Sequence, residues 1–256
     1  MFGFDERRRE RLRAEPLRAD WRAIIDREVA LTRRLSAVDR RELEGHTAVL
    51  LEEKNWEGAG GLEMTDRIRV TIAAQAALLL LHREIDEPYP RLRSIIVYPS
   101  GYVSEERHSL DGGMVVVEGP EHRLGESWPT GALVLAWDEV EAEARDPDAE
   151  SNVVLHEFAH QLDQQDGDAD GVPPLGSESA HREWQRVLSE EYLALRRAAK
   201  AGERGLLDDY GATNPAEFFA VASEAFFLRS GELRELQRAL YDELRAFYRQ
   251  DPAARG

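Results

Sequence analysis

Residues 152–163 read NVVLHEFAHQLD, and this segment determines both the expected local fold and the expected chemistry. Apolar residues at helical spacing predict a helix over Asn152–Leu162. Residues four apart lie one turn apart on one helix face, so His156 and His160 present two imidazoles to one metal ion. Glu157, next to the first histidine, is placed to take a proton from a water molecule that the metal activates.

A catalytic zinc site needs a third protein ligand, and the sequence leaves three candidates for it. Glu217 and Glu224 lie seven residues apart on a helix predicted over Asn214–Leu228, so both can share a face. Asp166 lies six residues after the second histidine, but the glycine with which such a site turns the chain is replaced by Asp163. From the residues alone, Glu217 ranks first, Glu224 second and Asp166 third.

Two carboxylates are candidates to orient the ligand histidines rather than to bind the metal. Asp163 lies three residues beyond His160 on the same helical face, where it can accept the spare ring N–H of a ligand histidine. Glu224 is the other candidate, once a different residue is taken as the third ligand. A surface salt bridge is an equally good interpretation of Asp163.

The composition excludes several other kinds of site. The chain of 256 residues contains no cysteine, which excludes disulfide scaffolds, thiol nucleophiles and thiolate zinc sites. Its formal charge of −17 disfavours direct binding of nucleic acid, because the phosphate backbone would be repelled. The N-terminus lacks the apolar core of a signal peptide, and the longest apolar stretch, 70–81, is too short to span a membrane. We therefore expect a cytoplasmic protein that binds neither nucleic acid nor membrane.

The remaining pattern predicts an α+β fold, with a mainly helical body and a small sheet. Residues 1–60 are highly charged and helical, and we expect them to pack as an N-terminal segment on a metallopeptidase domain over 61–256, forming one compact unit. The predicted elements are helices over Arg40–Trp56, Thr65–Leu81, Ser179–Lys200, Asn214–Leu228 and Glu232–Arg249, and strands over Leu92–Tyr98, Met114–Val117 and Gly131–Trp137.

Seven stretches form a pattern that is more specific than the histidine motif alone. They are GLEMTD (61–66), the apolar stretch 70–81, VYPS (97–100), GESW (125–128), VLAW (134–137), the histidine segment 152–163 and the stretch 210–227. With these stretches the chain resembles the Mlc titration factor A family, a group of glucose-linked bacterial zinc metallopeptidases. Residues 1–60 and the C-terminal end match that family weakly or not at all.

The resemblance implies a complete set of site residues and a zincin-like fold. The family resembles the catalytic domain of anthrax lethal factor, in which two histidines and a distant glutamate hold zinc, and a tyrosine seven residues before that glutamate faces the site. On this plan Glu217 is the third ligand to one Zn²⁺ per chain, and Tyr210 donates to the oxyanion of the transition state. Glu157 is the general base, which then passes its proton to the leaving amine.

The resemblance also implies functions that the residues alone do not. Family members have aminopeptidase-type activity on small synthetic substrates, so the resemblance implies a peptide substrate. They also bind and sequester Mlc, a DNA-binding repressor of sugar uptake. The alternative is a non-catalytic protein that binds a regulator, with a vestigial or structural metal site. An intact Glu157 favours the peptidase, because a structural metal has no use for a general base. The strand over Ala132–Trp137 is a candidate edge on which a peptide could lie extended, and a buried strand is an equally good interpretation.

Overall fold

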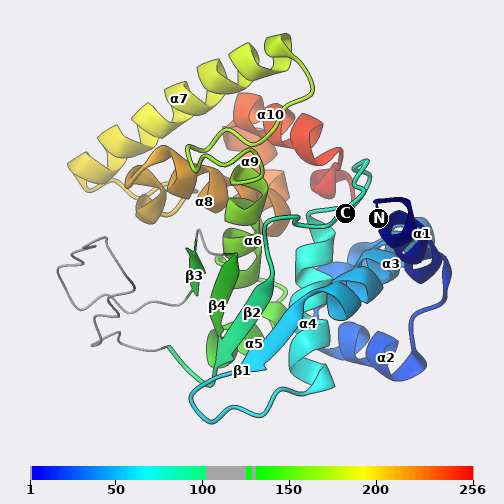
Figure 1. The fold of residues 1–256 in the computed structure, drawn as a ribbon. Helices are drawn as coiled ribbons and strands as arrows, with labels where there is room; N and C mark the ends of the chain where they lie inside the picture. The colour runs from blue at the N-terminus through cyan, green and yellow to red at the C-terminus, as the bar shows by residue number, and fades with distance from the viewer. Residues whose placement is uncertain (1, 102–124, 129–130, 256) are drawn as a thin grey trace, which may run out of the picture.

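A computed structural model describes residues 2–101, 125–128 and 131–255 of the chain (Figure 1). It is mainly helical with one small sheet, which confirms the predicted α+β class, whereas the zincin-like comparison stays a prediction. The helices are α1 (Phe2–Ala14), α2 (Ala19–Glu28), α3 (Ala37–Glu53), α4 (Asp66–Leu78), α5 (Trp137–Arg145), α6 (Val153–Asp163), α7 (Glu178–Ala201), α8 (Pro215–Leu228), α9 (Ser230–Leu236) and α10 (Arg238–Tyr248), with 3₁₀ turns η1 (Ala30–Arg34), η2 (Asp209–Ala212) and η3 (Pro252–Ala254).

The sheet has the strand order β1-β2-β4-β3. Its strands are β1 (Asn55–Gly58), β2 (Ser94–Tyr98), β3 (Gly125–Trp128) and β4 (Ala132–Ala136). β1, β2 and β4 are parallel, and β3 runs antiparallel to β4. Of the two interpretations of 132–137, the edge strand is wrong and the buried strand is confirmed, because β4 lies between β2 and β3 and is buried along most of its length. Within the described residues, β3 is the edge on that side.

Elements with strong local signals form close to where the sequence predicts them. The hydroxyl of Thr65 accepts the backbone N–H of Ile68 at 3.3 Å and starts α4, as expected of an N-cap. β2, α7 and α8 also lie within about two residues of their predicted bounds, which is the usual uncertainty of element ends.

Four predictions need correction or lie outside the description. Residues 55 and 56 belong to a strand rather than to the preceding helix, because β1 pairs with β2. Trp137 begins the unpredicted helix α5 instead of ending a strand. The sequence of α5 is rich in acidic residues, so the apolar spacing of its buried residues Val140 and Ala144, one helical turn apart, is not recognisable as a helix pattern. The predicted helix over Glu232–Arg249 is broken at Gln237 into α9 and α10. The predicted strand over Met114–Val117 lies outside the described residues.

The histidine helix α6 lies between the sheet and the C-terminal helices (Figure 1). It packs on α8, α4 and α5 and contacts β3 and β4. Phe158 is fully buried on its inner face, and its ring meets that of Tyr89 edge to face with centroids 4.8 Å apart. α8 is apolar almost all round and buried along most of its length, which makes it a central helix of the core. No helix in the described part of the chain combines the length and apolarity needed to cross a membrane.

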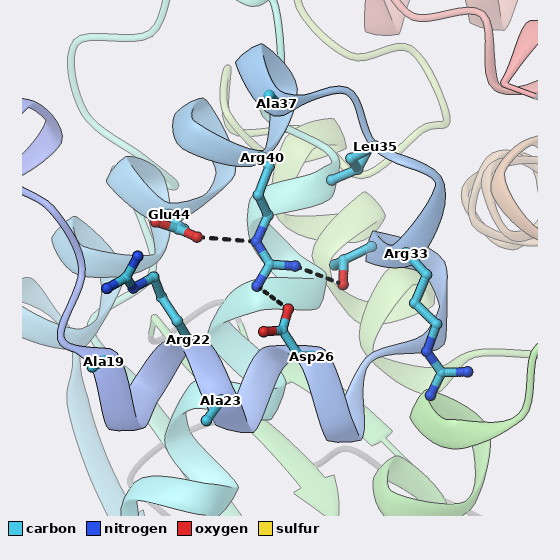
Figure 2. Close-up of a pocket in the computed structure, with 10 residues that line it drawn as sticks. Ala19, Arg22, Ala23, Asp26, Arg33, Leu35, Ala37, Arg40 and Glu44 are labelled. Atoms are coloured by element: carbon cyan, nitrogen blue, oxygen red, sulfur yellow. Dashed lines mark hydrogen bonds and ion pairs between the residues drawn. The ribbon is translucent and has the colours of Figure 1, made fainter.

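The N-terminal elements α2, η1 and α3 line an open hollow of about 640 Å³ at the surface (Figure 2). Arg40 reaches into it and donates to Glu44 at 3.0 Å, to Asp26 at 2.6 Å and to the hydroxyl of Thr32 at 3.2 Å. One guanidinium therefore ties the three elements around the hollow to one another.

Glu28 at the end of α2 ties the N-terminal helices to the rest of the fold. Its side chain is 1% exposed and accepts hydrogen bonds from Arg27, from Arg67 of α4 and from Arg145 of α5. Burial raises the pKa of Glu28, but the hydrogen bonds from Arg145, Arg27 and Arg67 outweigh it and lower the pKa to about 2. The hydrophobic cluster also joins residues from both sides of position 60. The division into 1–60 and 61–256 stays a prediction.

We predict that Glu28→Gln lowers the free energy of unfolding by about 3 kcal/mol at pH 7, because it removes a buried carboxylate shared by three arginines. The folded-state pKa lies below the ordinary value of 4.5, so this stabilisation is fully present above about pH 5 and is lost as the pH falls toward 2. Urea unfolding of both proteins at pH 7 and pH 3.5 measures it. Glu52→Gln, which removes an exposed ion pair with Arg8, is the control and should change stability little. Equal losses for the two variants would contradict the assignment.

Candidate active site

Three hydrogen bonds to side chains fix the N-terminus of α6. The amide oxygen of Asn152 accepts the backbone N–H of Leu155 at 2.9 Å and caps the helix, which the sequence predicts to start at Asn152. The N–H of Val153 donates to Glu143 of α5 at 2.6 Å. The N–H of Asn152 itself donates to Glu224 of α8, also at 2.6 Å. Helices on both sides of α6 therefore hold the turn that precedes the first histidine.

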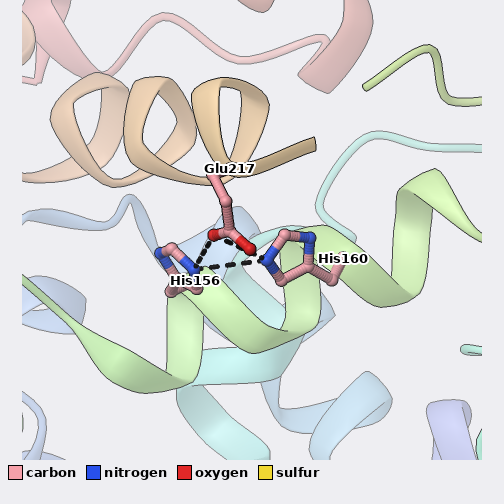
Figure 3. A group of neighbouring side chains, drawn as sticks. All are labelled: His156, His160 and Glu217. Carbon is pink, nitrogen blue, oxygen red and sulfur yellow. Dashed lines mark hydrogen bonds and ion pairs between the residues drawn. The ribbon is translucent and has the colours of Figure 1, made fainter. Parts of the chain in front are cut away.

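His156, His160 and Glu217 meet at one point between α6 and α8 (Figure 3). The Nε2 atoms of the two histidines are 3.2 Å apart. Oε2 of Glu217 lies 3.0 Å from Nε2 of His156 and 3.3 Å from Nε2 of His160. Glu217 stands in the first turn of α8, where Asn214 caps the helix and Pro215 opens it, so the helix start aims the carboxylate at α6.

This arrangement fits a metal ion by distance. Zinc–ligand distances of about 2.0–2.1 Å at tetrahedral angles place neighbouring ligand atoms about 3.3 Å apart. The three observed separations, 3.0, 3.2 and 3.3 Å, are close to that value. Among the described residues, this is the group of histidine and acidic side chains with the spacing of a metal site.

The arrangement also fits a cation by charge. Oε1 of Glu224 lies 2.8 Å from Nδ1 of His156, and a carboxylate there accepts the ring N–H. The Nε2 of a neutral His156 then turns its lone pair toward His160 and Glu217. Two imidazole lone pairs and a carboxylate oxygen repel one another at these distances unless a positive charge lies among them.

The pKa values of His156 and Glu217 show that this group of side chains favours a positive charge. Burial lowers the pKa of His156, but the hydrogen bonds with Glu217 and Glu224 outweigh it and raise the pKa to about 10. Burial raises the pKa of Glu217, but the hydrogen bonds with His156 and His160 outweigh it and lower the pKa to about 2. A proton therefore binds to His156 when nothing else supplies the charge, and a metal ion would have to displace it.

The two residues predicted to do the chemistry both lie beside this group. Glu157 is 5% exposed, and its charge acts directly on His156. Tyr210 is on η2, which packs against α7 and α8, and its ring centroid lies 6.0 Å from that of His156. The side chain of Tyr210 is 55% exposed, so it borders the site from the solvent side.

The structure separates the remaining candidates. Glu224 contacts His156, as an orienting carboxylate should. Asp163 is fully buried, and Oδ2 accepts the N–H of Gly171 at 2.9 Å; within the described residues it receives no hydrogen bond from a ligand histidine. Burial raises the pKa of Asp163 to about 6. Asp166 accepts the N–H of Asp168 in a local turn and does not belong to the metal-binding group.

Gly171 also bears on the site, although no pattern in the sequence singles it out. Its N–H donates to Asp163, and its carbonyl accepts the indole N–H of Trp184 at 2.9 Å. Its φ is +78°, and a Cβ there would come within 2.4 Å of the carbonyl oxygen of Pro215. Pro215 lies two residues before Glu217, so this close approach helps to set the position of Glu217. The acidic loop 163–176 gave only a general turn signal, and the contact depends on tertiary structure.

Comparison with known proteins agrees with this geometry. The family described as glucose-regulated metallo-peptidase M90 matches residues 4–249, so the expectation that residues 1–60 match weakly or not at all is wrong. An uncharacterized protein of Synechocystis sp. is 39% identical over 246 residues, covering 96% of this chain and 89% of that protein. Mlc titration factor A of Serratia proteamaculans is 34% identical over 227 residues, covering 86% and 85%, and that of Yersinia pestis is 30% identical over 241 residues, covering 93% and 86%.

We predict that Gly171→Ala weakens divalent metal binding about 10-fold or more, because the new Cβ displaces the start of α8 and with it Glu217. Titration of the metal-free protein with Co²⁺, followed by absorption, measures the change. Gly202→Ala is the matched control, since Gly202 also has a positive φ, +71°, but has open space around its Cβ position. That control should lose some stability and keep its metal affinity. Equal affinity in both variants would rule out the role given to Gly171.

Proposed function

The chain belongs to the family of glucose-regulated M90 metallopeptidases, and we propose on that basis that it is a zinc-dependent peptidase of the aminopeptidase type. The observation that carries the proposal is the convergence of three ligand atoms from His156, His160 and Glu217 at 3.0–3.3 Å. Two imidazoles and one carboxylate are a donor set that suits zinc in catalytic sites, where a fourth position stays open.

A zinc ion held by these side chains would lower the pKa of a water molecule toward about 7 and polarise the carbonyl of the scissile bond. The acid–base work falls to Glu157. Its carboxylate takes a proton from the attacking water and later delivers it to the nitrogen of the leaving amine. Its burial and its place directly after His156 support this assignment.

We assign Tyr210 to the oxygen that gains negative charge in the transition state. The phenol is a neutral hydrogen-bond donor at the pH of the reaction, so it can stabilise the oxyanion without carrying a competing charge. The exposure of its side chain and its 6.0 Å ring separation from His156 support a position at the mouth of the site.

We further propose that the peptide substrate lies along β3. Within the described sheet, this strand is the edge beside β4, and an edge strand is where an extended chain can add. β3 also contacts α6, which carries the two histidines. A peptide added to this edge would pass beside the catalytic group, whereas one on β1 would be separated from it by β2 and β4.

A second candidate function is the binding of a DNA-binding repressor of the Mlc type. It is supported by the name of the Serratia and Yersinia relatives, Mlc titration factor A. The two functions are compatible, and a non-catalytic regulator-binding protein remains the alternative to the peptidase. A cytoplasmic location is part of the same proposal, because a repressor of that type acts in the cytoplasm.

We predict that Glu157→Gln abolishes peptidase activity, with kcat/KM falling by about 10²–10⁴, while one Zn²⁺ per chain stays bound. The zinc-loaded protein and variant are assayed with fluorogenic aminoacyl substrates and with internally quenched peptides, and zinc is measured by atomic absorption. Cleavage of the aminoacyl substrates alone identifies an aminopeptidase. Glu203→Gln, on the surface beyond α7, is the control and should keep full activity. An active Glu157→Gln protein would remove the general base from the mechanism.

We predict that Tyr210→Phe lowers kcat about 100-fold and leaves KM and zinc content nearly unchanged, because it removes a hydrogen bond made only in the transition state. Steady-state kinetics on the best substrate of the parent measures the split. Tyr192→Phe on α7, whose ring packs against Phe218, is the control for loss of a phenol elsewhere and should leave kcat unchanged. A rise in KM without a fall in kcat would assign Tyr210 to substrate binding instead.

A further inference from the structure

A buried chain of hydrogen bonds runs from α4 to the first ligand histidine. It begins at Gln75, which is fully buried in a helix whose other buried residues are apolar except for Thr71. Gln75 accepts the side-chain N–H of Asn152 at 2.7 Å. The backbone N–H of Asn152 donates to Oε2 of Glu224, and Oε1 of Glu224 accepts the Nδ1–H of His156. Three helices, α4, α6 and α8, thus share one polar path through the core.

Each amide in this chain has only one orientation that satisfies its partners. Nε2 of Gln75 donates to the carbonyl of Thr71 at 3.2 Å, so Oε1 must face Asn152. The amide of Asn152 then directs its NH₂ group to Gln75 and its oxygen to the N–H of Leu155. Rotating either amide by 180° would oppose like atoms at buried contacts.

The fixed direction continues into the metal-binding group. Both carboxylate oxygens of Glu224 accept hydrogen bonds, one from the backbone of Asn152 and one from the ring of His156. The carboxylate therefore cannot turn without breaking one of them. Its position places the His156 ring proton on Nδ1 and directs Nε2 toward His160 and Glu217.

We propose that Gln75 and Asn152 are positioning residues for the metal site. Gln75 fixes the side-chain amide of Asn152. The backbone N–H of Asn152 in turn fixes the carboxylate of Glu224, and that carboxylate sets the tautomer and ring orientation of His156. This inference rests on the proposed metal-binding function. It adds that Gln75 of the apolar helix α4, whose hydrogen bonds go to Thr71 and Asn152 and not to a ligand side chain, tunes the affinity for a divalent cation.

The first test is the binding of Co²⁺ to metal-free Gln75→Met, a change that keeps the length of the side chain and removes both of its hydrogen bonds. We expect the dissociation constant for Co²⁺ to rise about 10-fold and the visible absorption of the bound ion to change, because the ligand field depends on the orientation of His156. The Nδ1–H signal of His156 in the zinc-loaded protein should also exchange faster with water. Thr47→Val removes a buried hydrogen bond in α3, from the Thr47 hydroxyl to the carbonyl of Leu43, and should leave all three readouts unchanged.

A second variant keeps the test decisive if Gln75→Met does not fold. Asn152→Ser retains a good helix cap but is too short to reach Gln75, so it separates the cap from the chain of hydrogen bonds. It should weaken Co²⁺ binding to a similar extent, and the double variant should be little weaker than either single one, because both remove the same coupling. Wild-type affinity and spectrum in the folded single variants, or full additivity in the double variant, would overturn the proposal. Failure of the parent itself to bind Co²⁺ would instead overturn the metal site on which it rests.

Discussion

The packing of α6 on α8 is the contact on which the candidate active site depends. His156 and Glu217 are separated by 61 residues in the chain, yet their ligand atoms lie 3.0 Å apart. A shift of one helix against the other by a few tenths of an ångström would already spoil the distances that a metal requires. The apolar faces of both helices lie in the core, where close packing leaves little room for such a shift.

Because α8 is buried, each of its few polar side chains needs a partner. The helix is apolar apart from Glu217, Ser223 and Glu224, and a buried carboxylate is costly unless it is paired. Each of the two carboxylates contacts one ring nitrogen of His156: Glu224 contacts Nδ1, and Glu217 contacts Nε2. The same hydrophobic core that fixes the two helices therefore leaves these carboxylates one set of partners, and the histidine is held from both sides.

The parts of the fold that were predictable from the sequence depend on local patterns. The helix starts at Asn152 and at Asn214–Pro215 and the four-residue histidine spacing each depend on residues within one turn, and the structure contains all three features. The helix break at Gln237 and the pairing of β1 depend on contacts between distant segments, and the sequence pattern does not record them. Gln75 shows the same limit, because an amide in an apolar helix gives no sign of its partner.

The balance of charge at the site links the fold to its ligand. Three glutamates, Glu157, Glu217 and Glu224, surround His156, and each favours the protonated ring. Replacing that single proton by a divalent ion adds one more positive charge where three carboxylates face one another, and it removes the repulsion between the imidazole lone pairs. Folding must therefore bring together a group that is electrostatically incomplete. The hydrophobic burial of α6 and α8 outweighs the repulsion between these side chains. Because a cation would bind the folded state and relieve that repulsion, it would raise the free energy of unfolding.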